Sequence, residues 1–96
     1  MTKETIKKLS NIIEKRSREL PSGSYVTKLI KEGKVKIANK LGEESVETIT
    51  AFLAQEKPEI IEESADLIFH LLILLKASDL SFEDVLKALD ERMKND

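Results

Sequence analysis

Apolar residues recur at intervals of three and four along most of this 96-residue chain, which is the period of an amphipathic helix. The pattern predicts five helices, over residues 3–19, 25–31, 34–55, 59–78 and 82–93. Pro21 and Gly23 separate the first two helices, and Gly33 interrupts the pattern before the third. Because β-branched residues nowhere alternate with polar ones over a useful length, we expect no sheet.

The third predicted helix has an apolar stripe. Val46, Ile49 and Leu53 fall within about 60° of one another when they are placed on a helical wheel. We expect this stripe to face the core.

The fourth predicted helix is apolar on nearly every side, since its longest apolar run covers nine residues, Leu67 to Leu75, and contains only His70 as a polar member. Such a helix lies at the centre of its bundle, and a chain of 96 residues can hardly bury all of it. We therefore predict a single all-α domain over residues 1–96. It is a helical bundle of four to five helices, completed by homodimerisation or by a higher homo-oligomer.

Acidic residues gather on the two longest helices, in the clusters Glu43, Glu44 and Glu47, and Glu62, Glu63 and Asp66. Glu44 and Glu47 are three residues apart, as are Glu63 and Asp66, so each pair shares one helix face. If the short linker brings these faces together, each close pair of carboxylates repels by about 3 kcal/mol at ~6 Å and an effective dielectric of ~20. A hard divalent cation such as Mg²⁺ would offset this repulsion, because it prefers oxygen ligands.

Basic residues precede the first acidic cluster on the same helix. Lys36 and Lys40 form a like-charged pair four residues apart, which is mildly destabilising on an isolated helix. Their position one turn before the carboxylates is the order needed to hold a phosphate beside a metal. Arg16 lies near the apolar stripe of the first helix, where it either extends its charged end to water or points at an anion.

The acidic pairs and His70 also have simpler explanations than a metal-binding site. Each acidic pair taken alone is better explained as a solvated helix face, because such spacings occur by chance in charged helices. The two pairs together, beside an apolar helix and after a lysine-bearing face, favour a site. His70 is better explained as a core histidine with satisfied hydrogen bonds than as a metal ligand, although a bond to Asp66 or Glu63 is a further alternative.

The composition of the chain excludes several classes of function. Residues 1–40 carry eleven Lys and Arg against four Asp and Glu, and residues 41–96 carry five against fourteen. The acidic part would repel a nucleic-acid backbone, and there is almost no aromatic interleaving, so we expect no nucleic-acid partner. The absence of cysteine excludes thiolate chemistry. The apolar run is far shorter than the roughly 20 residues that cross a bilayer, and the charged N-terminus is unlike a signal peptide, so we predict a cytoplasmic protein without membrane contact.

Two strings carry a family resemblance. GEESVE at residues 42–47 and EESADLIFHLL at 62–72 resemble the EExxE…ExxD signature of the all-α nucleoside triphosphate pyrophosphohydrolases, the MazG-like superfamily. The upstream string SYVTKL at 24–29, followed by Gly33, Lys36 and Lys40, resembles the phosphoribosyl-ATP pyrophosphohydrolases of histidine biosynthesis more particularly. The similarity covers roughly residues 6–92. Phe69 departs from the usual Tyr, and Val26 interrupts the usual Ser-Tyr-Thr string.

The resemblance implies hydrolysis of phosphoribosyl-ATP between its α- and β-phosphates, which releases pyrophosphate and phosphoribosyl-AMP in the second step of the histidine pathway. It implies that Mg²⁺ is held by Glu44, Glu47, Glu63 and Asp66. The implied catalytic residues are Glu43, Glu44 and Glu47, with Glu43 either taking a proton from the attacking water or supporting a ligand. The candidate substrate and phosphate contacts are Lys36, Lys40, Lys28, Arg16, Ser24 and Tyr25.

Two other functions compete with this one. A house-cleaning enzyme would keep the chemistry but act on non-standard nucleoside triphosphates, and the SYVTKL string argues against it. A non-enzymatic helical module would only oligomerise, and replacing its acidic residues would leave its stability unchanged or increase it.

Overall fold

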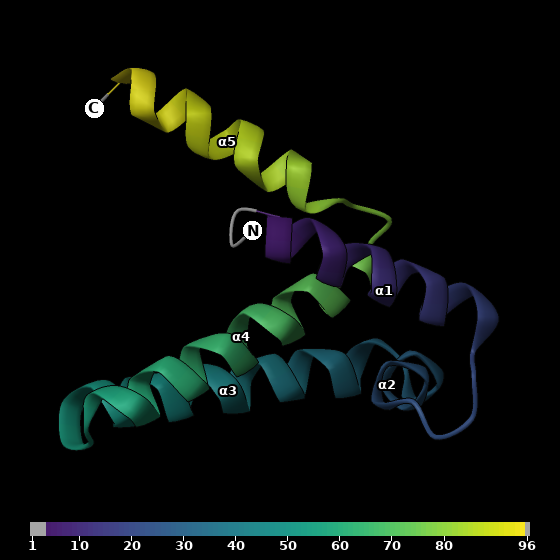
Figure 1. Ribbon diagram of the computed structural model, residues 1–96, viewed down its shortest axis with the longest axis horizontal. Helices are drawn as coiled ribbons and strands as arrows, with labels where there is room; N and C mark the ends of the chain where they lie inside the picture. The colour runs from purple at the N-terminus through teal and green to yellow at the C-terminus, as the bar shows by residue number, and fades with distance from the viewer. Residues whose placement is uncertain (1–3, 96) are drawn as a thin grey trace.

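The computed structural model describes residues 4–95, and over that range the chain consists of helices joined by short connections (Figure 1). The helices are α1 (Thr5–Glu19), α2 (Tyr25–Glu32), α3 (Lys34–Ala54), α4 (Lys57–Ala77) and α5 (Phe82–Asn95). The prediction of an all-α chain with five helices is confirmed. Lys3, which the periodicity assigned to the first helix, lies outside the described residues.

The breaks between helices follow from local chemistry. Gly33 has a φ of 95°, a conformation that costs a glycine little, and it separates α2 from α3 as predicted. Ser24 caps α2, because its side-chain oxygen accepts the Thr27 backbone N–H at 3.3 Å. Figure 1 views α2 along its axis whereas α3 runs across the picture, so the chain turns sharply at Gly33. The N-terminal end of α2 therefore lies away from the axis of α3.

α3 and α4 form a helical hairpin in which the two helices lie side by side (Figure 1). α1 packs against α2 and against α4. The core cluster consists of Ile13, Val26, Leu29, Ile37, Leu72, Ile73 and Leu75. These residues gather where α1 and α2 meet the beginning of α3 and the end of α4. The opposite end of the hairpin, near the α3–α4 connection, contributes nothing to this cluster.

The predicted core stripe of α3 is wrong for a single chain. Val46, Ile49 and Leu53 are 62%, 57% and 74% exposed. The buried residues of α3 are instead Ile37, Glu44 and Ala51, which are spaced seven apart. Because α3 turns that second face toward α4, the apolar stripe lies on the other side of the helix and faces solvent.

α5 is attached mainly through its first turn. The Ser81 backbone N–H donates to Asp84 Oδ2 at 2.9 Å in a capping-box arrangement, and this bond holds the pKa of Asp84 below its usual value. Phe82 and Val85 pack against the core. No residue of α5 is buried, and Figure 1 shows its far end standing clear of the other helices.

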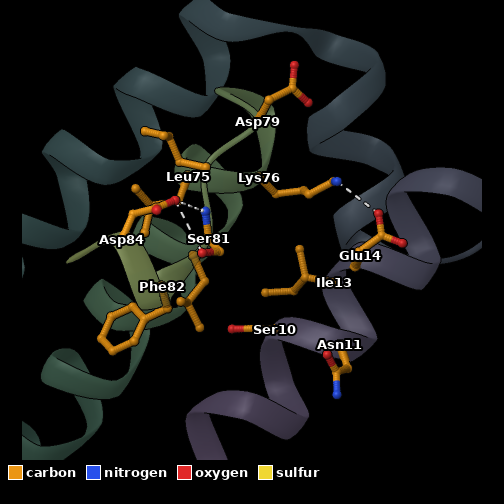
Figure 2. A pocket seen from close by; sticks show the side chains of 12 residues that line it. Ser10, Asn11, Ile13, Glu14, Leu75, Lys76, Asp79, Ser81, Phe82 and Asp84 are labelled. Carbon is orange, nitrogen blue, oxygen red and sulfur yellow. Dashed lines mark hydrogen bonds and ion pairs between the residues drawn. The ribbon is translucent and has the colours of Figure 1, made fainter. Parts of the chain in front are cut away.

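A cavity of about 410 Å³ lies where α5 begins, between α1 and the end of α4. Figure 2 shows Lys76 reaching across it to Glu14, and the two groups form an ion pair of 2.8 Å. None of the predicted site residues lines this cavity. Across residues 4–95, no helix combines the length and the apolar character that crossing a membrane requires.

Candidate active site

Three carboxylates from two helices meet on the facing sides of the α3–α4 hairpin. Glu44 of α3 and Glu63 and Asp66 of α4 each offer one oxygen, and these oxygens all lie within 4.8 Å of one another. Glu44 is only 7% exposed, Glu63 is half-buried and Asp66 is exposed. The structure thus brings together residues from both predicted acidic clusters. We call Glu44, Glu63 and Asp66 the acidic cluster below.

The fourth predicted ligand, Glu47, lies beside the acidic cluster on its exposed side. Burial raises the pKa of Glu44, and the neighbouring carboxyl of Glu47 raises it further by hydrogen bonding and by its charge. The pKa of Glu63 is raised in the same way, first by desolvation and then by Glu47, with the charges of Asp66 and Glu44 adding to the effect. Both shifts show that the folded chain places these carboxyls where a proton or a cation is favoured.

Two oxygens of the cluster have no hydrogen-bond donor. Glu44 Oε2 and Glu63 Oε1 are buried, and neither has a partner among residues 4–95. A buried carboxylate oxygen without a donor is costly, since nothing replaces the water it has lost. A cation would satisfy both atoms, and a set of ligands made only of carboxylate oxygens fits a hard divalent ion such as Mg²⁺.

Thr48 connects the two helices next to this cluster. Its Oγ1 lies 2.8 Å from the backbone carbonyl of Glu44 and 3.1 Å from that of Glu63, so one hydroxyl proton is shared between two acceptors. The bond to Glu63 fixes the position of α4 relative to α3 at the site. Sequence reasoning missed Thr48, and its one sequence signal is that it follows Glu44 by four residues, on the same helix face.

Replacing Thr48 with valine should loosen the site, because valine has a similar shape but no hydroxyl proton to donate. We expect the free energy of unfolding to fall by about 1 kcal/mol, the net value of one hydrogen bond. We also expect Mg²⁺ to bind at least tenfold more weakly, an effect on the order of 10- to 100-fold being usual for groups that orient ligands. Calorimetry and urea denaturation measure the two quantities. Thr50→Val is the control, since Thr50 is exposed on the same helix; equal Mg²⁺ affinity in both variants would remove the orienting role.

The basic residue next to the cluster is Lys40. Its Nζ lies 3.5 Å from Glu43 Oε1, and the side chain is 25% exposed. The pKa of Lys40 lies above its usual value, chiefly through electrostatic attraction to Tyr25. Glu43 and Glu44 raise it further, and together these effects exceed the lowering that desolvation causes. Glu43 therefore lies on the rim of the site, paired with a lysine and outside the three-oxygen group.

The remaining predicted contacts are spread more widely. Ser24, Tyr25 and Lys28 line an open cavity of about 520 Å³ at the N-terminal end of α2. Lys36 and Arg16 are exposed, and no hydrogen bond or ion pair within residues 4–95 joins either side chain to the acidic cluster. Their role in phosphate binding stays a prediction.

His70 is buried and lies one turn after Asp66 on α4. Its Nδ1 lies 2.7 Å from the backbone carbonyl of Asp66, and its Nε2 lies 3.0 Å from the Tyr25 hydroxyl. The histidine is therefore hydrogen-bonded on both nitrogens. The partner on Asp66 is its backbone carbonyl group.

Comparison with known proteins places the chain in a family. The family model described as phosphoribosyl-ATP pyrophosphohydrolase matches residues 6–93. A phosphoribosyl-ATP pyrophosphatase of Metallosphaera sedula is 44% identical over 91 residues, which cover 95% of this chain and 98% of the relative. One from Saccharolobus islandicus is 43% identical over 98% of this chain and 100% of the relative. The histidine biosynthesis bifunctional protein HisIE of Thermotoga maritima is 43% identical over 90% of this chain and 44% of its own length. This chain belongs to the phosphoribosyl-ATP pyrophosphohydrolase family.

Proposed function

We propose that this protein hydrolyses phosphoribosyl-ATP to phosphoribosyl-AMP and pyrophosphate, the second step of histidine biosynthesis. The observation that carries the proposal is the acidic cluster, whose three oxygens lie within 4.8 Å of one another on two facing helices. The names of the relatives from Metallosphaera sedula and Saccharolobus islandicus, which are 44% and 43% identical to this chain over the aligned residues, supply the substrate, and the name of HisIE supplies the pathway. A cytoplasmic location and the absence of a nucleic-acid partner stay predictions.

The residues that would hold Mg²⁺ are Glu44, Glu63 and Asp66, with Glu47 completing the set from the exposed side. The buried oxygens Glu44 Oε2 and Glu63 Oε1 support this assignment, because neither has a hydrogen-bond partner among residues 4–95 and a bound cation would supply one. When bound, such an ion neutralises phosphate charge and lowers the pKa of a coordinated water. The protein supplies the fixed geometry: α3 and α4 hold the ligands, and Thr48 ties the two helices together beside them.

Residues around the cluster have complementary roles. Glu47 is exposed and lies next to the two carboxyls with raised pKa, so it completes the ligand set from the side that is open to substrate. Lys40 binds a phosphate oxygen beside the cluster, and Glu43 holds the lysine in place through their ion pair.

The cationic and hydroxyl groups farther along bind the rest of the substrate. We assign Ser24 and Lys28 to a phosphate that lies at the N-terminal end of α2, where backbone N–H groups and a lysine favour an anion, and Tyr25 lines the same cavity. Lys36 and Arg16 extend this positive surface. Phosphoribosyl-ATP carries phosphate at both of its ends, which matches a site with cations on more than one side.

We also propose that two copies of the chain form the working enzyme. The chain exposes 7199 Å², whereas a compact monomer of this size exposes about 5,600 Å². Its radius of gyration is 14.6 Å, against about 12.5 Å for a compact chain of equal length. The difference of about 1,600 Å² per copy is in the range of obligate homodimers.

The stripe of Val46, Ile49 and Leu53 is the surface that a second copy would cover. It lies on the side of α3 that faces away from α4, and a twofold axis lets the same uncharged stripe pack against itself. Gly42 lies on this side of α3 and has open space around it, since a Cβ built there meets no atom within 4 Å. A partner helix can therefore approach closely.

Pyrophosphate release tests the proposed reaction directly. With phosphoribosyl-ATP and Mg²⁺ we expect rapid release, and none after chelation with EDTA, because the acidic cluster then lacks its counter-charge. A panel of phosphoribosyl-ATP, dATP, dCTP, dUTP and dITP, each assayed with Mg²⁺, Mn²⁺ or Ca²⁺, separates the candidates. Preference for one of the deoxynucleotides would replace the proposal with the house-cleaning function.

A further inference from the structure

The hydrogen bonds of His70 fix which nitrogen carries its proton. Nδ1 lies 2.7 Å from the carbonyl oxygen of Asp66, and a carbonyl can only accept, so Nδ1 is the donor. In the neutral ring Nε2 is then unprotonated. The Tyr25 hydroxyl, 3.0 Å away, must donate to it. The phenolic O–H of Tyr25 therefore points at His70, and only the oxygen's lone pairs remain for other partners.

Ring packing holds Tyr25 in the same place. Its ring stacks on that of Phe69, with centroids 6.1 Å apart and planes at 22°. His70 meets both rings edge-on, at centroid distances of 5.7 Å from Tyr25 and 5.4 Å from Phe69. Tyr25 is nevertheless 38% exposed and lines the cavity at the start of α2. Its buried edge is anchored on α4, and its open edge faces the proposed substrate.

We propose that His70 is a positioning residue, which holds the Tyr25 hydroxyl against α4 by accepting its hydrogen bond at Nε2 while donating Nδ1–H to the backbone carbonyl of Asp66. The consequence for substrate binding rests on the proposed function. In this arrangement Tyr25 does not donate a hydrogen bond to phosphate. It shapes the cavity at the start of α2, and its bond to His70 ties α2 to α4 one turn after Asp66.

The composition of the chain makes the hydrogen bonds measurable. His70 is the single histidine and Tyr25 the single tyrosine, so imidazole nitrogen signals in a ¹⁵N NMR spectrum belong to His70 alone. At a pH of about 8.5, well above the ordinary imidazole pKa, we expect Nδ1 protonated and Nε2 unprotonated. Tyr25→Phe should shift the Nε2 resonance and leave Nδ1 in place. A ring protonated on Nε2, or an Nε2 resonance unmoved by Tyr25→Phe, overturns the proposal whether or not the enzyme is active.

Kinetics test the consequence for substrate binding. His70→Leu removes both bonds, and we expect the KM for phosphoribosyl-ATP to rise about tenfold or more with a smaller change in kcat. His70→Gln places an amide oxygen near the position of Nε2, so its KM should lie much closer to the wild-type value than that of His70→Leu. Tyr25→Phe should resemble His70→Leu, and the double variant should be no worse than either.

The results of these experiments distinguish failure of the positioning role of His70 from failure of the proposed reaction. Equal loss of kcat and stability in His70→Leu, without rescue by glutamine, would leave His70 as a packing residue. If His70→Leu does not fold, Tyr25→Phe alone decides the KM effect. If the wild-type protein releases no pyrophosphate from phosphoribosyl-ATP, the proposed function fails, and the NMR spectrum still decides whether His70 holds Tyr25.

Discussion

Replacing Glu44 with glutamine should abolish pyrophosphate release and at the same time make the metal-free protein more stable. Glutamine keeps the size of the side chain but removes the buried charge that a cation would neutralise. We expect kcat to fall by roughly 10³-fold or more, as when a group that stabilises transition-state charge is lost. Pyrophosphate release measures the first effect, and urea denaturation in EDTA measures the second.

The gain in stability of the metal-free Glu44→Gln variant depends on pH, because the pKa values of the cluster carboxyls are raised in the folded protein. Because the pKa of Glu44 and of Glu63 is raised in the folded protein, the folded chain keeps protons that the unfolded chain has released. Their contribution to metal-free stability is fully present below the ordinary carboxyl pKa of 4.5 and is lost as the pH rises through the raised values. The metal-free wild-type protein should therefore lose this contribution as the pH rises above 4.5, and Glu44→Gln should lose less of it, so the difference in stability between the two proteins should grow with pH.

Glu62→Gln is the matched control. Glu62 is exposed next to Glu63 but lies outside the acidic cluster, so this variant should keep both activity and the wild-type pH dependence. Saturating Mg²⁺ should restore stability at neutral pH in the wild-type protein and not in Glu44→Gln. A Glu44→Gln variant with unchanged pyrophosphate release would show that the reaction does not depend on the buried carboxylate of Glu44.

The local features of this fold could be predicted from the sequence because they depend on neighbouring residues. The helical period, the break at Gly33 and the cap at Ser24 are set by a few adjacent side chains. The meeting of the two acidic clusters could also be anticipated, since each pair is spaced along one face and the linker between the helices is short. Helical spacing placed each pair on one helix face, and the family resemblance implied a common ligand set, of which Glu44, Glu63 and Asp66 lie together in the structure.

The features that the sequence did not predict depend on which partner a surface meets. Periodicity shows that Val46, Ile49 and Leu53 form an apolar face, but it does not show whether that face packs within one chain or between two. In this chain α3 turns a less apolar face, which includes Glu44, toward α4. The bonds of Thr48 and His70 end on backbone carbonyls, which every residue has, so no residue pattern marks them.

Replacing Ile49 with glutamate should convert the proposed dimer into monomers. Ile49 lies in the exposed stripe of α3, and a twofold contact would bring two new carboxylates into one apolar interface. Burying a charge without a partner costs several kcal/mol, and each 1.4 kcal/mol weakens association about tenfold. Sedimentation analysis should give a dimer for the wild-type protein and a monomer for Ile49→Glu.

Ala54→Glu adds the same charge to the exposed surface of α3 at about 80° or more from each residue of the stripe, and it should leave the dimer intact. A wild-type protein that sediments as a monomer, or an Ile49→Glu variant that stays dimeric, would contradict an interface at this stripe. Since Glu44, Glu63 and Asp66 all come from one chain, the monomeric variant should still bind Mg²⁺ in calorimetry. Loss of metal binding together with the dimer would show that the hairpin keeps its geometry only when a second copy supports it.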